Sequence, residues 1–380
     1  MPRLLHIMDY EPRGTRTIDH FILDLSRAMQ ASGWEVRFAF GAQPPPEFQR
    51  TLAEVGAGYV VIPFPFTRSS VRELLHRLNG YRPDLIQTSF LSAFCWPLLR
   101  LKLQGRTRRL VVIDHSSGEA PIRRGWRKWS ARLRGWAVGK IVDAVVPVSQ
   151  AIATRDIERV FLPARKIRVV YNGIALERFP SPPRAERGAV RVVYVGQLIP
   201  EKGVTTLLRA HRTLRGGGVA GYELLIAGQG SQEHELKSYC ESAGLLDVRF
   251  LGHLDSVPEL LGSADVVVVP SIWFEAFGLA LVEAMACGAA CLVSDAGALA
   301  EVVGEAGRVF KAGDDGDLAL RLQELIEAAE DRRRLGLAAR KRVETLFTLD
   351  RMVEGHKSVC EDALAGSPIP SGDLAHSEEV

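Results

Sequence analysis

Residues Val266–Gly278 read VVVVPSIWFEAFG, and the order of residue types in this segment predicts the architecture of the whole chain. Four consecutive valines indicate a strand that is buried on both faces, as strands inside parallel sheets are. Pro270 ends the strand, and a loop carrying Glu275 leads into a predicted helix over Leu279–Cys287. A strand, a loop and a helix in this order form the repeating unit of α/β proteins.

The same alternation of short apolar runs and longer helical patterns continues along nearly the whole chain. In the first half, strands are predicted over 3–8, 35–40, 59–62, 85–88, 110–114, 144–148 and 167–170. In the second half, they are predicted over 191–195, 223–227, 248–251, 264–269 and 290–293. We therefore expect an α/β fold with two Rossmann-like, doubly wound parallel-sheet domains that face a central cleft.

The boundary between the two domains is expected at Pro180–Gly188, where proline and charge replace both periodic patterns. The prediction assigns 1–180 to an N-terminal Rossmann-like domain, 181–189 to a linker and 190–347 to a C-terminal one. Residues 348–365 are expected to form a helix that packs back on the N-terminal domain. Residues 366–380, rich in serine, proline and acidic side chains, are expected to be a mobile tail.

The composition is that of a globular protein. The 380 residues include 48 Lys plus Arg and 45 Asp plus Glu, a net charge of +3, with 47% apolar and 24% charged residues. These values exclude a wholly disordered, collagen-like or coiled-coil chain. No run of eighteen apolar residues and no leader-like N-terminus occurs, and the five cysteines are widely spaced. We expect a cytoplasmic protein whose membrane contact, if it has one, is peripheral.

The first motif with chemical meaning is Gly196–Gly203, GQLIPEKG, which follows the first strand of the second half and opens a helix over Val204–Arg215. Gly196 lets the backbone approach a ligand, the helix start offers free amides, and Lys202 adds a positive charge. This arrangement suits a diphosphate. The alternative is a solvated lysine in an ordinary turn.

The second motif pairs Glu275 with Glu283, eight positions later. Eight helical steps would place them about 80° apart on one helix, but a loop residue and a helix residue can face the same cleft. Carboxylates accept hydrogen bonds from the hydroxyl groups of a sugar or a ribose. The amides of Phe277, Gly278 and Leu279 would point at phosphate oxygens between them. The alternative is an acidic helix start with Glu283 on a solvated face.

With Glu275 and Glu283 in an E-x7-E arrangement and a lysine motif at Gly196–Gly203, the chain resembles the family 4 retaining glycosyltransferases of the GT-B fold. Further stretches fall in the order that this family shows: 145–149, 171–174, 227–230 and 250–252. The resemblance implies that the second domain holds a nucleoside-diphosphate sugar and that the first presents the acceptor.

The resemblance also implies individual roles. Glu283 would bind the ribose hydroxyls, Glu275 a hydroxyl of the donor sugar, and Lys202 the departing diphosphate. Since the family retains anomeric configuration without an obvious nucleophile, we assign Glu275 to positioning and not to covalent attack. No metal and no cofactor is expected, because the nucleotide sugar is itself a substrate and Asp315–Asp317 lies far past the site in the sequence.

Other expected contacts come from the loops. Gly228, Gly230 and the backbone of Leu251–Leu254, with Leu254 as its last residue, would border the nucleobase. His115, after the strand 110–114, matches the first-domain histidine that approaches the donor sugar near its reacting carbon. The alternative for His115 is a side chain that merely ends a strand.

Two positions depart from the family pattern. Gln197 stands where many members carry an arginine that stabilises the departing diphosphate. Gly14 is the single glycine of the loop Pro12–Thr17, where members often have a Gly-Gly pair. Gln197 and Gly14 are still expected to line the substrate site.

A basic, tryptophan-bearing segment lies at Pro121–Lys140 and has no acidic residue. Its basic residues are Arg123, Arg124, Arg127, Lys128, Arg132, Arg134 and Lys140. Trp126, Trp129, Leu133 and Trp136 recur at helical spacing, which is typical of helices that bind anionic membrane surfaces. The alternative is that the tryptophans pack on the sheet. A nucleic-acid partner is not expected from the near-neutral charge.

The sequence therefore predicts a metal-independent hexosyltransferase, transferring sugar to a lipid-linked, polysaccharide or other glycan acceptor. One alternative is a nucleotide-sugar epimerase of related fold, and another is a non-catalytic, membrane-docked nucleotide-sugar-binding protein. A dinucleotide oxidoreductase is disfavoured, because no G-x-G-x-x-G follows an early strand.

Overall fold

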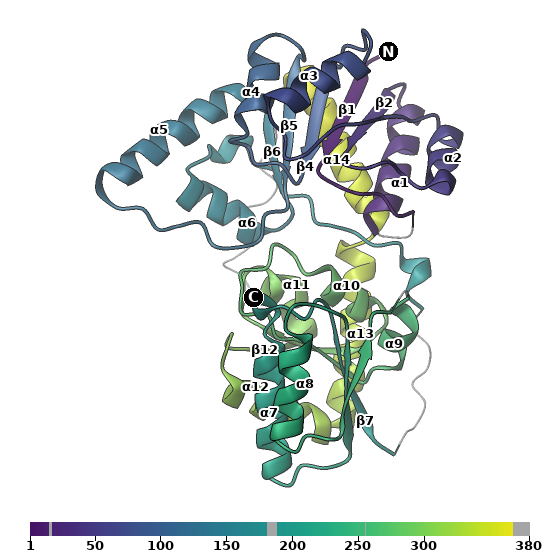
Figure 1. Ribbon diagram of the computed structural model, residues 1–380, viewed down its shortest axis with the longest axis vertical. Helices are drawn as coiled ribbons and strands as arrows, with labels where there is room; N and C mark the ends of the chain where they lie inside the picture. Colours follow the sequence, from purple (N-terminus) through teal and green to yellow (C-terminus); the bar gives the residue numbers. More distant parts are fainter. Residues whose placement is uncertain (15–16, 181–187, 255, 368–380) are drawn as a thin grey trace. The chain divides into compact units, whose positions relative to one another are not determined.

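The protein is described by a computed structural model covering residues 1–14, 17–180, 188–254 and 256–367 (Figure 1). The chain forms two compact units. Unit 1 comprises Met1–Gly173 and the chain from Leu349 on, and unit 2 comprises Ile174–Thr348. Most of the expected linker, 181–187, and most of the expected tail, 368–380, lie outside the described residues.

Unit 1 is built on a six-stranded parallel sheet with the order β3-β2-β1-β4-β5-β6. Its strands are β1 (Arg3–Met8), β2 (Glu35–Phe40), β3 (Gly58–Val61), β4 (Leu85–Ser89), β5 (Arg109–Asp114) and β6 (Ala144–Pro147). Its helices are α1 (Thr17–Ala31), α2 (Pro46–Glu54), α3 (Arg68–Arg77), α4 (Trp96–Leu103), α5 (Gly125–Ile141), α6 (Gln150–Arg155) and α14 (Leu349–Ala365). The predicted strand 167–170 does not form a regular strand, although Ile167 makes an isolated parallel bridge to Val145, and Arg168 N and Val170 N donate to Val145 O and Pro147 O of β6 at 3.1 and 3.2 Å.

Unit 2 repeats this topology, with the order β12-β11-β10-β7-β8-β9. Its strands are β7 (Val190–Val195), β8 (Tyr222–Ala227), β9 (Val248–Gly252), β10 (Val266–Val269), β11 (Ala290–Ser294) and β12 (Gly307–Phe310). Its helices are α7 (Val204–Gly216), α8 (Glu233–Ser242), α9 (Pro258–Ser263), α10 (Leu279–Ala286), α11 (Leu299–Val303), α12 (Asp315–Glu327) and α13 (Ala329–Leu346). The two Rossmann-like sheets confirm the predicted fold class.

Strand β12 was not predicted from the sequence. It is an edge strand, paired only with β11, and three of its four residues are partly or fully exposed. An edge strand needs fewer apolar residues than a central one, so its pattern is weak.

Residues 174–180, which the sequence placed with the first domain, are held in unit 2. Ile174 N donates to Phe347 O at 2.9 Å, and the Arg340 guanidinium donates to Phe179 O at 2.7 Å.

Helix α14 closes unit 1 by packing against α1, β4 and β5. Two polar pairs lie in this otherwise apolar core. Gln87 on β4 lies 3.2 Å from His356 on α14, and His6 on β1 lies 2.9 Å from Ser89 on β4. Burial lowers the pKa of His6 to about 3 and that of His356 well below its usual value. Both imidazoles are therefore neutral, so that these groups add no buried charge to the core. Each of His6, Gln87 and His356 also has one buried polar atom, Nδ1, Oε1 and Nε2 respectively, without a partner among the described residues.

These histidines make the stability of unit 1 depend on pH. Above about pH 6.5, His6 is uncharged in the folded and the unfolded chain alike. Below that value the unfolded chain binds a proton that the folded chain refuses until about pH 3. As the pH is lowered from about 6.5 towards about 3, His6 should therefore lower the free energy of unfolding by about 1.4 kcal/mol per pH unit. His356 should act in the same direction. Urea unfolding at pH values above and below 6.5 measures this loss of stability. A free energy of unfolding that does not change with pH would contradict the prediction.

Candidate functional site

Unit 2 brings three polar side chains together at the carboxyl ends of β7 and β10. The Lys202 ammonium donates to Oε1 of Glu275 at 2.6 Å, and the Ser271 hydroxyl donates to the same oxygen at 2.6 Å. Glu275 is only 8% exposed, whereas the Lys202 side chain is about one-third exposed. Two of the predicted residues, Lys202 and Glu275, thus form one group. Ser271 was missed by the sequence analysis, although its place directly after the strand-ending proline was a usable signal.

The parallel sheet explains why these three side chains lie together. Strands β7 and β10 are neighbours, with Val266 opposite Val192, so the loops that follow them leave the same edge of the sheet. Ile272 N donates to Glu201 O at 3.0 Å between these loops. Gly203 has a φ of +66°, and a Cβ there would lie 2.0 Å from Pro270 O. A side chain at this position would force the lysine loop away from the glutamate loop.

The loop after β11 supports Glu275 from the other side. Ala298 N donates to Glu275 O at 2.9 Å, and the Ser294 hydroxyl donates to Ser271 O at 2.6 Å. A Cβ on Gly297 would lie 2.4 Å from Glu275 O. The backbone of the Glu275 loop is therefore held by the loop after β11, and its carboxylate by Lys202 and Ser271, which is what a pre-organised binding group requires.

Gly228 and Gly230 pack against the lysine loop. A Cβ on Gly228 would lie 1.8 Å from Gly196 O, and one on Gly230 would lie 2.2 Å from Leu198 O. Leu198 N donates to the carbonyl of the residue between these glycines at 2.9 Å. Their contact with a nucleobase stays a prediction, but the structure gives both glycines a packing role that demands the absence of a side chain.

Gln197 takes part through its backbone, since its carbonyl accepts the Tyr194 hydroxyl at 2.7 Å. Burial raises the pKa of Tyr194, and the negative charge of Glu275 adds to this effect, so the phenol stays protonated and keeps donating. This bond fixes the backbone where many family members carry an arginine. It supplies no positive charge in place of the arginine.

The remaining predicted residues of unit 2 lie on the loop and helix that follow Glu275, apart from Leu254 in the loop after β9. Gly278, with a φ of +93°, directly precedes α10, whose first residue is Leu279. Phe277 is buried edge-on against Phe347, with ring centroids 5.5 Å apart, so only its backbone can meet a ligand. Glu283 is half-buried on α10, and Leu254 is half-buried. Their roles in ligand binding stay predictions.

In unit 1, His115 directly follows β5. Its ring stacks on Phe90 at 4.5 Å, and Phe90 in turn stacks on Tyr10 at 6.3 Å. Burial lowers the pKa of His115 to about 4, although the negative charge of Asp114 acts in the opposite direction. The imidazole is therefore neutral at physiological pH and can donate or accept a hydrogen bond.

Gly14 lies in the loop after β1 with a φ of +85°, and buried Asp19 holds that loop. The Asp19 carboxylate accepts from the Tyr10 hydroxyl at 3.1 Å and from Arg13 N at 3.4 Å. Asp19 was missed by the sequence analysis. Whether Gly14 contacts a substrate stays a prediction.

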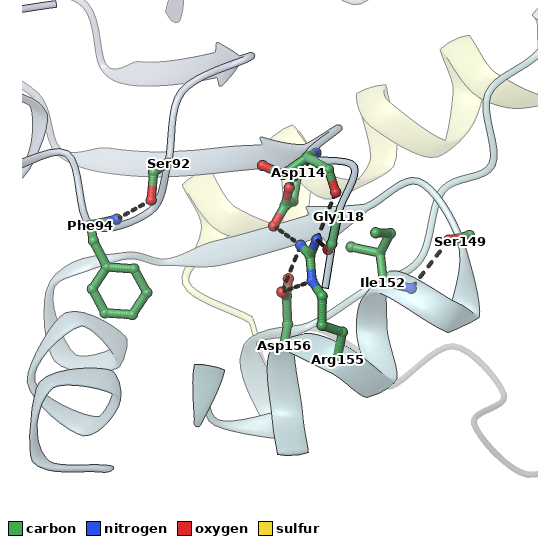
Figure 2. A network of polar contacts seen from close by, with 9 residues as sticks. Ser92, Phe94, Asp114, Gly118, Ser149, Ile152, Arg155 and Asp156 are labelled. Atoms are coloured by element: carbon green, nitrogen blue, oxygen red, sulfur yellow. Dashed lines mark hydrogen bonds and ion pairs between the residues drawn. The ribbon is translucent and has the colours of Figure 1, made fainter. Parts of the chain in front are cut away.

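Arg155 holds the loop that follows β5 and begins with His115, and Figure 2 shows its contacts with Asp114, Gly118 and Asp156. Its guanidinium donates to Asp114 at 2.8 Å, to Asp156 at 3.1 Å, and to the carbonyls of Ser116 and Gly118 at 2.6 and 3.2 Å. Burial and, to a lesser extent, the neighbouring Asp114 raise the pKa of Asp156 to about 8, against the opposing effect of Arg155. Sequence reasoning missed this network, because its members come from β5 and α6 and share no motif.

Neither a metal-binding cluster nor a membrane-spanning helix occurs among the described residues. No group of three or more His, Cys, Asp or Glu side chains among them could hold a metal ion. None of the helices in the same residues is both long and apolar enough to cross a bilayer.

The glycine contacts generate a prediction. Gly228→Ala should destabilise unit 2 by about 2 kcal/mol or more, because the new Cβ overlaps the Gly196 carbonyl. Gly216→Ala is the matched control, since a Cβ there meets no atom within 4 Å and the residue lies in α7. It should leave the chain as stable or slightly more stable. Chemical unfolding of both variants measures the difference, and equal effects would refute the packing role.

Comparison with known proteins identifies the family and the fold. The family described as "Glycosyltransferase Family 4" matches residues 18–178, and that described as "Glycosyl transferases group 1" matches residues 178–342. The chain is 35% identical over 327 residues to the phosphatidyl-myo-inositol mannosyltransferase of Mycobacterium leprae, covering 80% of this chain and 81% of that one. It is also 35% identical over 249 residues to a Mycobacterium tuberculosis glycogen synthase, covering 64% of this chain and 59% of the relative's length.

Among solved structures, the Anabaena protein HepE in complex with UDP and glucose superimposes with a TM-score of 0.73 at 18% identity, covering 94% of this chain and 99% of that one. At this identity the likeness concerns the fold. The two parallel six-stranded sheets are those of GT-B glycosyltransferases. The chain therefore belongs to the group 1, or family 4, glycosyltransferases.

Proposed function

We propose that this protein transfers a hexosyl group from a nucleoside-diphosphate sugar to a glycan, polysaccharide or lipid-linked acceptor, with retention of configuration and without a metal ion. The observation that carries the proposal is the Lys202–Glu275 ion pair at the carboxyl ends of β7 and β10. Ligands of open α/β sheets bind at this end of the strands, beside the point where strand order reverses. HepE, of the same fold, was solved in complex with UDP and glucose, and two relatives are named for mannosyl transfer and glycogen synthesis.

Lys202 has the charge and the freedom to meet a diphosphate. Its ammonium has three N–H donors, and the contact with Glu275 uses one of them. The side chain is about one-third exposed, so the other donors can reach an incoming phosphate oxygen. When the sugar–phosphate bond breaks, negative charge develops on the departing diphosphate, and a positioned cation stabilises it.

Glu275 is suited to orient the sugar. Its Oε1 accepts from Lys202 and Ser271, and no described residue donates to its Oε2. That oxygen is available for a sugar hydroxyl. A fixed carboxylate that grips one hydroxyl selects the pose of the sugar ring, which is a positioning role and needs no covalent intermediate.

The other assignments complete the donor site in unit 2 and the acceptor site in unit 1. In unit 2, Glu283 would bind the ribose, and the backbone at Phe277, Gly278 and Leu279 the phosphates. Gly228, Gly230 and Leu254 would border the base, and Gln197 the diphosphate. In unit 1, neutral His115 would approach the reacting carbon and Gly14 the acceptor.

The donor site generates a prediction. Lys202→Gln should lower kcat/KM for donor hydrolysis by about 100-fold or more, because the leaving diphosphate loses its cation. Glu275→Gln should lower it as well, because the pose of the sugar is lost. Lys237→Gln and Glu233→Gln are the matched controls, since these residues form an exposed ion pair on α8. Slow hydrolysis of labelled nucleotide sugars measures all four variants without a known acceptor.

Several outcomes would overturn the assignment. Full turnover in Lys202→Gln and Glu275→Gln would reject the site. Conversion of the donor into its epimer would favour the epimerase alternative. Stabilisation of the chain by nucleoside diphosphates with no turnover for any acceptor would favour a non-catalytic binding protein.

We also propose that unit 1 docks on an anionic membrane surface at the cytoplasmic face through α5. Trp126, Trp129, Leu133 and Trp136 are 75%, 68%, 49% and 57% exposed. The alternative, in which these tryptophans pack on the sheet, does not fit these values. Exposed tryptophans among basic residues are typical of helices that lie at a membrane interface.

The opposite face of α5 explains why the tryptophans point outward. Its buried residues are Ala131, Gly135, Val138 and Gly139. A Cβ on Gly135 would lie 2.3 Å from Phe161 O, and one on Gly139 would lie 2.5 Å from the Pro163 ring. At about 100° per residue, this face is centred about 150° from the tryptophan face. The small residues let α5 pack closely on unit 1, so the large ones are left to solvent.

Docking can be tested with vesicles. The protein should co-sediment with anionic but not with neutral vesicles, and less at high salt, because each basic residue near the surface contributes about 1 kcal/mol. Trp126→Ala/Trp129→Ala should reduce binding about tenfold or more, since both indoles leave the interface. Leu246→Ala/Leu337→Ala, two exposed apolar residues of unit 2, is the control. Equal binding to both vesicle types would count against docking.

A further inference from the structure

Unit 1 contains a cavity of about 280 Å³ that the proposed reaction does not use. The loop that follows β5, the residues around the start of α5, and the end of α6 line it. We call it the β5 cavity. Its polar lining includes Ser116, Ser117, Arg123, Arg134 and Asp156. The volume is at the lower end of the range of ligand pockets, roughly 300–1,000 Å³, and suits a small polar group.

Arg155 fixes the wall of the β5 cavity. Its guanidinium binds the carbonyls of Ser116 and Gly118 while also pairing with Asp114 (Figure 2). In a trans peptide the N–H points opposite to the C=O. The amides of Ser117 and Glu119 therefore point away from Arg155, on a loop that lines the cavity.

The charge of the lining is positive. Among the described residues, neither Arg123 nor Arg134 has an acidic partner, and the Arg134 guanidinium lies over the Phe94 ring at 4.9 Å. The carboxylates of the wall are already engaged, Asp114 by Arg155 and Glu119 by Arg159.

Asp156 adds little negative charge to this wall. Burial raises its pKa to about 8, so at neutral pH the carboxyl is largely protonated. Its buried Oδ2 has no hydrogen-bond partner among the described residues. Two guanidinium groups with no acidic partner among the described residues, and two serine hydroxyls, therefore line the cavity beside the already paired carboxylates of Asp114 and Glu119.

We propose that the β5 cavity binds a phosphate group carried on a small polar moiety. Planar guanidinium groups bind phosphate through paired N–H donors, and hydroxyl and amide donors occupy its remaining oxygens. Arg134 belongs to α5 and Arg123 directly precedes it, so the cavity adjoins the proposed docking helix. The phosphate can come from a membrane lipid headgroup or from a soluble phosphomonoester, and the chemistry of recognition is the same. The proposal rests on unit 1 alone and does not depend on glycosyl transfer.

Binding of glycerol 3-phosphate and of inorganic phosphate to the full chain, measured by calorimetry at fixed ionic strength, tests the site. Arg123→Gln/Arg134→Gln should weaken binding about tenfold or more, since two charge-assisted contacts are lost. The control Arg50→Gln/Arg72→Gln removes the same charge from exposed positions on α2 and α3 and should bind as the parent chain does.

A second pair of variants keeps both arginines. Ser117→Asp places a carboxylate in the cavity lining and should abolish phosphate binding by repulsion. Ser32→Asp, at an exposed position after α1, adds the same charge and should not change it. Thermal unfolding without ligand checks that each variant is folded.

The two sources of phosphate are separated with vesicles. Vesicles of phosphatidylcholine with phosphatidic acid are compared with vesicles in which phosphatidylserine supplies the same surface charge. If binding prefers phosphatidic acid and the preference vanishes in Ser117→Asp, the source is a lipid phosphate. If only the soluble ligands distinguish the variants, the source is a soluble phosphomonoester. If the cavity variants equal their controls in both assays, the proposal is wrong, whatever the outcome for Lys202 and Glu275.

Discussion

Parallel pairing of β7 with β10 is the constraint on which the proposed donor site of unit 2 depends. It brings Lys202 and Glu275, 73 positions apart in the sequence, to 2.6 Å. A partly buried ion pair contributes little net stability, because desolvation of both charges offsets their attraction. Its position at a topological switch point is better explained by a polar ligand than by folding. The glycines around this ion pair are explained in the same way, because each of them lets the backbone of one loop contact the backbone of the next.

Unit 1 buries polar side chains both in its core and near the carboxyl end of β5. Its core tolerates His6, Gln87 and His356 because the imidazoles are neutral and hydrogen-bonded. Near the carboxyl end of β5, Arg155 satisfies two loop carbonyls and Asp114 at once. The loop that presents His115 is therefore fixed from within unit 1. The same contacts create the β5 cavity, so one arginine shapes both a predicted catalytic loop and a proposed phosphate site.

In helix α5, the small residues on one face determine that the large residues on the other face are exposed. Its sequence is amphipathic in a way that fits either a buried or an exposed tryptophan face. Gly135 and Gly139 resolve the choice, because backbone and ring atoms of Phe161 and Pro163 occupy the space where their side chains would be. The tryptophans then remain outside. The exposure of the tryptophans, on which the docking proposal rests, thus follows from packing on the opposite side of the helix.

The sequence by itself determined the fold class, most strands of both sheets, and the lysine and glutamate motifs, because buried parallel strands leave continuous apolar runs and because loops after them carry local patterns. It did not predict edge strand β12, whose exposure weakens its pattern, and it wrongly predicted a strand at 167–170. Only the tertiary structure placed Ser271 against Glu275, Arg155 against the β5 loop, and His356 against Gln87. Those contacts join residues from different elements, and no local periodicity encodes which side chains will meet when separate strands and helices pack.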